Sequence, residues 1–250
     1  MSSTQVVFKP GGVAALVVVF ATIIIVSLVG LRGRNASSTS GAAVGAVAVT
    51  PVVDDVPITG PELEERKFLA NLDATPGQKR NWLFLGPLLS GSNITNVENT
   101  KDDEAKMREI IGTSYLPTEA KYKAHENLPV TVNNATYRWR KVTGSAFDFK
   151  DMYASKTMPR SAMTNVVVYG YTTIESKGAT EKRLRFRSDD GAIVWINGQQ
   201  VYMGNKIRGV EIEDVIPVQL RPGRNNVLVK VGQGNGGWGM SFQVEDAPEK

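Results

Sequence analysis

Alternating apolar and polar positions dominate the second half of the chain and predict β-strands. Apolar and basic side chains alternate over residues 183–187, which is the period of two of a half-buried strand. Residues 192–196 are a short apolar run, and Asn197 and Gly198 after it tolerate the positive φ angles of a tight type I′ hairpin. Residues 227–231 alternate again. Short strands joined by turns cannot bury their apolar faces alone, so this pattern predicts an all-β sandwich or barrel.

Further strands and two short helices are predicted in the first part of the domain. Residues 81–87 are apolar and aromatic, and residues 137–142 and 165–176 show the β pattern. The segment 61–69 begins with proline and places acids before bases, as the dipole of a short helix favours. A second helix is expected at residues 102–111 inside a long polar excursion.

A continuous apolar run from Val13 to Leu31 (residues 13–31) predicts one transmembrane helix after a short polar amino terminus, residues 1–12. As a helix the run spans roughly 28 Å, which is about one hydrocarbon core. The alternatives are a cleaved signal peptide, whose apolar region is shorter, and a buried core helix. The run therefore predicts a single-pass membrane protein with the lipid bilayer as its first partner.

Charge and composition divide the remainder of the chain. Lys9 precedes the apolar run, whereas Arg32 and Arg34 follow it, so charge alone favours a cytoplasmic carboxy-terminal side. Residues 35–60 are rich in small side chains and nearly uncharged, which is typical of a flexible linker, and the linker as a whole is predicted at residues 32–60. The expected order is then a short helix and connector at 61–80 and the β-sandwich domain at 81–247.

The overall composition excludes several classes of chemistry. The chain has 250 residues, no cysteine, one histidine and a net charge of +4, a balance too weak to predict nucleic-acid binding. His125 has no histidine partner for a metal site and no Gly-x-Ser-x-Gly elbow accompanies it. Glycoside hydrolysis needs two carboxyl groups fixed at a defined distance across the scissile bond, and no pattern in the sequence indicates such a pair. We therefore predict that the protein is not an enzyme and carries no cofactor, with calcium as the one candidate.

The calcium candidate is built from Asp189, Asp190 and Asn197. Two hard carboxylates end a strand, and the asparagine follows one short strand later in a hairpin turn; calcium prefers such oxygen ligands. The alternative is that the two aspartates cap a turn and accept hydrogen bonds from nearby backbone amides.

Four other residues are candidates for contact with a ligand or partner. Trp238 lies in a glycine-rich loop, where it could stack on a sugar ring or serve as a core side chain beside the last strand. Arg183, Arg185 and Arg187 form a basic row on one strand face. That row could meet an anionic glycan, lipid headgroups or an acidic protein, or it could be an ordinary solvated face.

Taken in order, the motifs resemble the jelly-roll, galactose-binding-like modules of bacterial envelope and secreted proteins. The resemblance implies a jelly-roll β-sandwich, and PA14-type sandwiches are the second family that the Asp-Asp-Gly and Ile-Asn-Gly elements resemble. In PA14-type lectins the comparable aspartate pair binds calcium and then sugar. The segments that carry the resemblance are WLFLGPL at 82–88, TYRWRKV at 136–142, FDFKDMY at 147–153, VYGYTTIES at 168–176, SDDGAIVWING at 188–198, LRPGRNNVLVKV at 220–231 and GGWGMSFQV at 236–244.

Two functions follow from these expectations. In the first, the sandwich is a membrane-anchored, non-catalytic accessory or structural subunit that contacts a membrane-protein partner. In the second, it is a carbohydrate-binding module of the cell envelope, with calcium as a possible aid. The resemblance places the domain outside the cytoplasm, in a periplasmic or extracellular position, against the weak charge preference.

Overall fold

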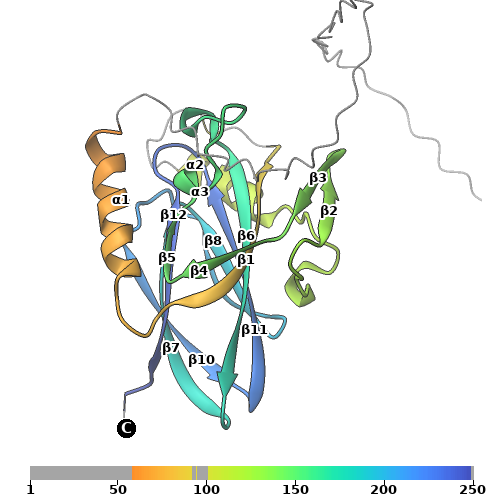
Figure 1. Cartoon of the computed structure of the whole chain (residues 1–250), viewed down its shortest axis with the longest axis vertical. Helices are drawn as coiled ribbons and strands as arrows, with labels where there is room; N and C mark the ends of the chain where they lie inside the picture. Colours follow the sequence, from red (N-terminus) through yellow and green to blue (C-terminus); the bar gives the residue numbers. More distant parts are fainter. Residues whose placement is uncertain (1–57, 92–93, 95–100, 249–250) are drawn as a thin grey trace, which may run out of the picture. The chain divides into compact units, whose positions relative to one another are not determined.

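Two antiparallel β-sheets pack face to face in the computed structural model, which describes residues 58–91, 94 and 101–248 (Figure 1). This arrangement confirms the predicted β-sandwich. The larger sheet has the strand order β4 (Arg140–Gly144), β1 (Arg80–Leu89), β6 (Val166–Ser176), β11 (Gly223–Gln233), β8 (Ala192–Ile196) and β9 (Gln199–Gly204). The smaller sheet has the order β10 (Glu213–Leu220), β7 (Thr180–Asp189), β12 (Gly239–Asp246) and β5 (Ala146–Asp148).

A separate hairpin and several short helices complete the described part of the chain. Proline in the first turn and Glu62 beside it favour the start of the first helix, and acidic residues fill the first turn of the second. These elements are α1 (Gly60–Asp73), α2 (Lys101–Gly112), α3 (Phe149–Tyr153), the 3₁₀ turns η1 (Glu119–Lys121) and η2 (Arg160–Ala162), and the hairpin strands β2 (Pro129–Val132) and β3 (Ala135–Arg138).

Local turn chemistry sets the strand register in the second half of the chain. Asn197 and Gly198 have φ angles of 52° and 86°, so the predicted tight hairpin joins β8 to β9. Strand β11 then pairs with β6 over its whole length, from Gly223 opposite Ser176 onward. The φ of Gly223 is 81°, which explains why glycine ends the turn before this long pairing.

The space between the sheets is filled by the alternating side chains that the sequence pattern predicted. Trp82, Phe186 and Phe242 meet there in edge-on ring contacts. One face of each central strand supplies this core, because successive side chains of a strand point to opposite sides. Its members from the central strands include Trp82, Phe84, Val166, Val168, Leu184, Phe186, Val194, Val227, Val229, Val231 and Phe242.

Much of the outer face of the six-stranded sheet is also buried, which the sequence pattern did not predict. The complementary side chains of its central strands, such as Val167, Ile193 and Leu228, form a second core with Met107 and Ile110 of α2. Part of this face is therefore covered by α2, by the segment that follows it and by the β2–β3 hairpin (Figure 1). The part that remains open forms the groove described below.

Trp139 interrupts what the sequence predicts as one strand over residues 137–142. The strand is divided into β3, which ends at Arg138, and β4, which begins at Arg140. The indole of Trp139 is completely buried in the outer core and stacks on Tyr122, with ring centroids 5.8 Å apart. Burial of this large ring explains why the chain leaves the hairpin there and joins the sheet.

Helix α1 packs against the four-stranded sheet over β5 and β12. Leu69 is its buried residue, and glycine makes the close approach possible, since a Cβ on Gly239 would lie 2.5 Å from Leu69 Cδ1. No helix in the described ranges is long and apolar enough to cross a membrane. The predicted span at residues 13–31 lies outside those ranges, as do residues 1–12 and nearly all of the linker, and these stay predictions.

Candidate functional site

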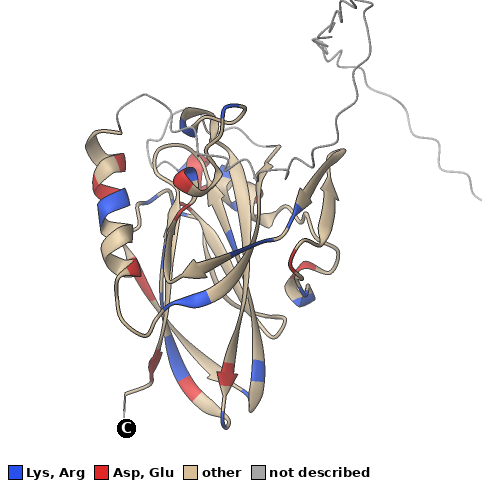
Figure 2. Cartoon of the chain, viewed as in Figure 1, with Lys and Arg blue, Asp and Glu red and all other residues tan. Residues whose placement is uncertain are grey.

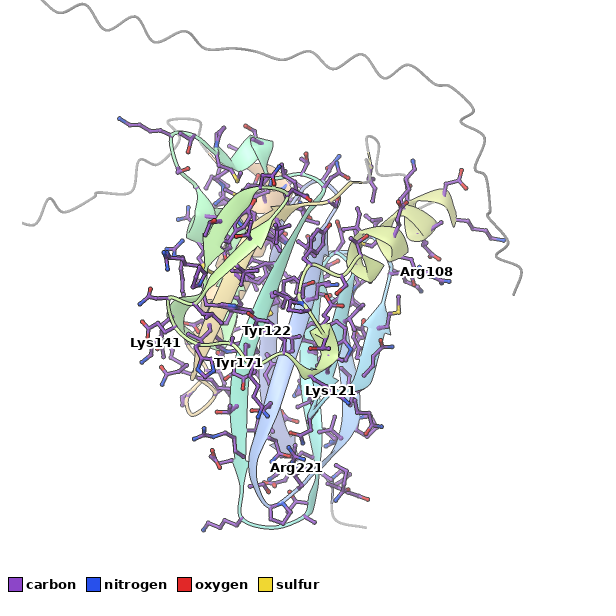
Figure 3. All side chains as sticks on the ribbon, turned by 90° about the vertical axis from the view of Figure 1, so that its right-hand side faces the viewer. Arg108, Lys121, Tyr122, Lys141, Tyr171 and Arg221 are labelled. Carbon is purple, nitrogen blue, oxygen red and sulfur yellow. The ribbon has the colours of Figure 1, made fainter. Side chains whose placement is uncertain are left out.

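Two cavities flank Tyr171 on the open part of the six-stranded sheet. One has a volume of about 220 Å³ and lies between Tyr122, Tyr171 and the turn at Asn197. The other has a volume of about 300 Å³ and lies between Tyr171, Lys141 and the loop at His125. Figure 3 shows Lys121, Tyr122 and Tyr171 close together on this face. We call this feature the tyrosine groove: the two cavities and the side chains that line them.

The floor of the tyrosine groove is tied together by side-chain amides. The Tyr171 hydroxyl donates a hydrogen bond of 2.8 Å to Asn226 Oδ1. The backbone N–H of Asn226 in turn donates to Asn197 Oδ1 at 3.0 Å, and Asn197 Nδ2 donates to Asn225 Oδ1 at 2.8 Å. These bonds hold the ring of Tyr171 and two amides in fixed positions, so the floor is preorganised for polar contacts.

One wall of the groove is held in place by a completely buried lysine. Lys230 Nζ donates hydrogen bonds to the carbonyl oxygens of Ile111 and Thr113, at 2.8 and 2.9 Å. It also forms an ion pair with Glu119 of η1, which accepts a hydrogen bond from the Tyr169 hydroxyl. Burial lowers the pKa of Lys230, and the charge of Glu119 opposes that shift. The network anchors the segment that carries Lys121 and Tyr122.

Four basic side chains around the groove have no ion-pair partner among the described residues: Lys121, Lys123, Lys141 and Arg221. All four are exposed and line one or other cavity. Lys121 lies over the hairpin turn, since a Cβ on Gly198 would be 3.0 Å from Lys121 Cγ. This face therefore presents positive charge beside two tyrosine rings.

A second feature is the group of three carboxyl side chains Glu65, Asp189 and Asp190 beneath α1, which we call the carboxyl cluster. A Cβ on Gly237 would lie 1.6 Å from Glu65 Oε2 and 2.8 Å from Asp189 Oδ2, so both carboxyl groups converge on this glycine. Asp189 is only 5 % exposed, and its Oδ1 has no hydrogen-bond partner. A cavity of about 730 Å³ between α1 and the loop at Glu211 opens onto Asp189.

All three members of the carboxyl cluster have raised pKa values. Burial raises the pKa of Glu65 to about 7 and the pKa of Asp190 to about 7. Burial also raises the pKa of Asp189 well above its ordinary value, and the neighbouring charges of Asp190 and Glu65 add to that rise. The cluster therefore retains protons near neutral pH.

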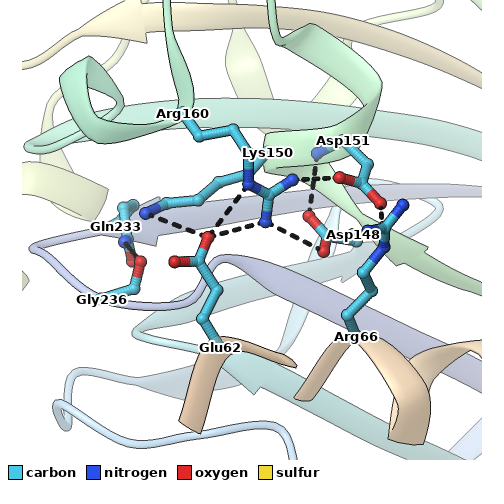
Figure 4. A network of polar contacts seen from close by, with 8 residues as sticks. All are labelled: Glu62, Arg66, Asp148, Lys150, Asp151, Arg160, Gln233 and Gly236. Atoms are coloured by element: carbon cyan, nitrogen blue, oxygen red, sulfur yellow. Dashed lines mark hydrogen bonds and ion pairs between the residues drawn. The ribbon is translucent and has the colours of Figure 1, made fainter. Parts of the chain in front are cut away.

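An ion-pair network beside the carboxyl cluster fastens α1 to α3 and η2 (Figure 4). Arg160 Nη2 lies 2.6 Å from Glu62 Oε1 and 3.4 Å from Asp148 Oδ2, and Arg160 also pairs with Asp151. Arg66 of α1 reaches Asp151 Oδ2 at 2.6 Å. Because Arg160 is buried and carries several acidic partners, this network fixes the position of α1 over the sandwich. Figure 2 shows that α1 carries both acidic and basic side chains.

The structure does not bring together the three residues predicted as a calcium site. Asn197 lies at the opposite end of β8 from the aspartates, and its amide belongs to the floor of the tyrosine groove. Asp190 Oδ1 accepts from the Arg208 backbone N–H at 3.0 Å, and Oδ2 accepts from that of Gly234 at 2.9 Å. No three potential ligand side chains among the described residues are grouped to hold a metal ion. Asp190 thus accepts from backbone amides 18 and 44 positions later in the chain rather than from its own turn, and the three residues predicted for calcium do not lie together.

Trp238 is a core residue, so its predicted role in stacking on a ligand is corrected. Its ring is 1 % exposed and packs against Phe149 and Tyr153, with centroids 5.1 and 6.2 Å away. The loop turns the ring inward because it fills the end of the sandwich, where burial of a large apolar surface is favourable.

The arginine row on β7 is largely neutralised by neighbouring strands. Arg185 pairs with Glu213 at 2.8 Å and with Glu245 at 3.2 Å. Arg187 pairs with the same Glu213 at 2.7 Å and lies over the ring of Phe68. Arg183 lines a separate cavity of about 340 Å³. Paired in this way, Arg185 and Arg187 belong to the solvated face that was the alternative, and they leave little charge for a partner.

Sequence reasoning missed the tyrosine groove. One residue could have indicated the covered face: Lys230 lies inside the apolar run of residues 227–231, where a lysine needs either a buried partner or an open face. The partner, Glu119, is 111 positions away and follows a polar excursion, so no local pattern connects the two. Lys121 and Tyr122 belong to the same excursion, and nothing local shows that it folds back over β6 and β11.

Comparison with known proteins gives no family assignment. No protein-family model matches the chain, and no curated protein matches it. Among solved structures, a β-glucosidase from Kluyveromyces marxianus matches with a TM-score of 0.38 and 15 % identity, over 50 % of this chain and 16 % of that chain. The match thus covers half of this chain and a small part of that enzyme.

Two structures that the chain covers more fully are PA14 domains. The PA14 domain of the MpAFP antifreeze protein matches with a TM-score of 0.36 and 11 % identity, over 71 % of this chain and 88 % of that domain. The PA14 sugar-binding domain from an RTX adhesin matches with a TM-score of 0.34 and 15 % identity, over 67 % and 89 %. At such TM-scores and identities these likenesses carry no argument about ligand or activity, which must come from the residues of this chain.

Proposed function

We propose that this protein is a non-catalytic saccharide-binding module whose ligand occupies the tyrosine groove. The observation that carries the proposal is the position of Tyr171, whose partly exposed ring separates two cavities and is fixed by Asn226. Saccharides present apolar C–H faces and hydroxyl groups, which match an aromatic ring beside amides. Tyr122 and Asn197 supply a second ring and a second amide in the same cavity.

Binding without catalysis is favoured by the arrangement of acidic groups. Glycoside hydrolysis uses two carboxyl groups about 5 Å or more apart on either side of the scissile bond. Glu65 and Asp189 instead share a hydrogen bond, which leaves no room for a glycosidic oxygen between them. The groove itself is lined by tyrosine, amide and basic side chains, with Glu126 as a carboxylate at one edge.

The proposal includes the finer assignment of the fold and the location of the module. We assign the sandwich to the galactose-binding-like jelly rolls, with the PA14 type as the alternative.

Residues 13–31 would anchor it in a membrane as a single-pass protein, with the domain outside the cytoplasm. An alkaline carbonate wash of membranes tests the anchor, because an integral protein remains in the pellet. The accessory role beside a membrane-protein partner would use the same anchor.

The test is direct binding of saccharides by the full chain in detergent. Neutral and acidic oligosaccharides are immobilised, and retention of the wild-type protein is compared with that of Tyr171→Ala. We expect the variant to lose most binding while a control, Tyr137→Ala on the β2–β3 hairpin, retains it. Circular dichroism establishes that both variants fold. Absence of binding to any saccharide, or equal binding by Tyr171→Ala, would overturn the proposal.

A further inference from the structure

We infer that the tyrosine groove is built for an acidic saccharide chain, at least two sugar units long, that crosses Tyr171 between Arg221 and Lys141. This inference rests on the proposed function, because it names the class of saccharide that the same groove would take. It depends on three observations: the unpaired basic side chains, the shared position of Tyr171 between two cavities, and the rigid amide floor.

Unpaired basic side chains gather at the two cavities of the groove. Arg185, Arg187 and Arg208 each have an acidic partner within 2.9 Å, and the buried Lys230 is paired with Glu119. Around the groove, in contrast, Lys121 and Arg221 border one cavity and face no described carboxylate in ion-pair contact. Basic side chains beside a hollow surface attract anions, and guanidinium groups bind carboxylates in a two-pronged geometry.

The nearby acidic groups do not cancel this charge. Glu119 is held by Lys230, and Glu175 is paired with Arg224 at 3.1 Å. Glu126 lines the cavity on the Lys141 side, beside His125, and is the acidic residue that lines either cavity among the described residues. Among the described residues, the cavity on the Arg221 side is lined by Lys121, Lys123 and Arg221 and by no acidic side chain. The positive potential is therefore strongest at that end.

The length of the ligand follows from the two cavities. Tyr171 borders both of them, so a chain that fills one can continue past this ring into the other. Figure 3 places Lys141 on one side of Tyr171 and Arg221 below it. Volumes of about 220 and 300 Å³ suit single sugar units, below or at the low end of the range for drug-sized ligands. A carboxylate on each unit would then meet a basic group at each end.

A carboxylated saccharide fits this combination better than other polyanions. Amide groups from Asn197 and Asn226 and the ring of Tyr171 suit hydroxyl groups and C–H faces. Binding of single-stranded nucleic acid uses aromatic platforms on which successive bases stack. Tyr122 is already stacked on Trp139, with an angle of 24° between the rings, so one of its faces is occupied. Nucleic acid and acidic peptide are kept as outcomes of the test.

The test compares a charged saccharide with a neutral ester of the same saccharide chain. Binding of the full chain in detergent to oligogalacturonate and to its methyl ester is measured by titration calorimetry at low and high salt. We expect tighter binding of the free acid and a loss of that advantage at high salt, because exposed charges are screened. Lys121→Gln, Lys141→Gln and Arg221→Gln should each weaken acid binding roughly two- to fivefold, as for exposed ion pairs. Lys156→Gln, an exposed lysine after α3, is the control.

The outcomes separate this inference from the function on which it rests. Equal binding of the acid and its ester would overturn the acidic-saccharide inference and leave saccharide binding intact. Binding of neither ligand, nor of any other saccharide, would remove both. Equal or tighter binding of single-stranded DNA or polyglutamate would show a general polyanion surface and also overturn the inference. Unchanged affinity in all three glutamine variants would exclude the groove as the acid site.

Discussion

Lys230 of β11 forms an ion pair with Glu119 of η1, and this pair joins the six-stranded sheet to the segment that forms one wall of the tyrosine groove. Lys230 is completely buried, whereas the side chain of Glu119 is 13 % exposed. Two backbone carbonyl groups also accept hydrogen bonds from Lys230. Removal of this lysine is costly, because Glu119 would be left as an unpaired charge and two buried carbonyl groups would lose their hydrogen-bond donor.

We predict that Lys230→Met destabilises the domain by about 3–5 kcal/mol, the usual cost of leaving one member of a buried pair uncompensated. The double variant Lys230→Met/Glu119→Leu should recover much of that loss, because it buries no unpaired charge. Urea unfolding of both variants measures the difference in the free energy of unfolding. Lys177→Met, at an exposed position, should stay within about 0.5 kcal/mol of wild type.

The same pair affects the groove, which gives a second readout. A variant that keeps the fold but loses this anchor should bind saccharide more weakly, since Lys121 and Tyr122 would no longer be held over the hairpin turn at Gly198. A double variant as stable as wild type and with unchanged affinity would show that the pair contributes to stability alone.

The carboxyl cluster predicts a stability that falls as pH rises. Glu65 and Asp190 have ordinary pKa values of 4.5 and 3.8, and burial raises each to about 7 in the folded protein. Between these limits the folded state binds more protons than the unfolded state, so the free energy of unfolding decreases as pH increases. We expect a lower unfolding midpoint at pH 8 than at pH 5, measured by thermal melting of the full chain.

Glu65→Gln tests the origin of that slope. The amide keeps the shape and removes the titrating group, so the variant should show a smaller decrease of the midpoint between pH 5 and pH 8. Glu64→Gln on the exposed side of α1 is the matched control, because Glu64 pairs only with Lys67 three residues away. A slope that is identical in wild type and Glu65→Gln would assign the pH dependence to other groups.

Much of the sandwich was predictable because its signals are local. Asn197 and Gly198 specify a hairpin by their tolerance of positive φ, and Phe186 and Val229 belong to period-two patterns that identify the inner face. Only the aspartate pair of the carboxyl cluster could be predicted from the sequence. Asp189 and Asp190 are adjacent in the sequence, but Glu65 reaches them only because α1 packs on a glycine-rich loop 172 residues later, at Gly237.

The tyrosine groove was not predictable for a different reason. Tyr169 and Tyr171 share a strand face in the sequence pattern, yet Tyr169 is completely buried and Tyr171 is partly exposed. What separates them is the extent of the cover over β6, which comes from the segment around Glu119 and Tyr115. A long polar excursion has no periodicity that indicates where it lies, so its contacts depend on tertiary structure.

The absence of a side chain at Gly239 allows α1 to lie close against the sandwich. A Cβ at this position would lie 2.5 Å from Leu69 Cδ1 and 2.9 Å from the Phe147 carbonyl oxygen. Gly239→Ala should therefore disturb both the helix and the pairing of β12 with β5, at a cost of about 1–3 kcal/mol. Chemical denaturation measures the loss, and limited proteolysis near α1 should become faster.

Gly178→Ala is the matched control for this prediction. No atom lies within 4 Å of the position that its Cβ would take, so the substitution should change the free energy of unfolding by less than about 0.5 kcal/mol. If Gly239→Ala were equally harmless, the close approach of α1 to β12 would be unimportant for stability, and other contacts of the helix, such as the Arg160 network, would hold it in place.

Asp189 distinguishes a proton-bound cluster from a calcium site. Both oxygens of Asp190 already accept backbone hydrogen bonds, which leaves Glu65 and Asp189 as the carboxylates available to a cation, whereas calcium takes six to eight oxygen ligands. We therefore expect millimolar calcium to leave the unfolding midpoint unchanged. Asp189→Asn should raise the midpoint at pH 8 more than at pH 5, because the amide removes a buried negative charge between two others. Stabilisation of the wild type by calcium, abolished in Asp189→Asn, would reverse this conclusion and assign the cluster to metal binding.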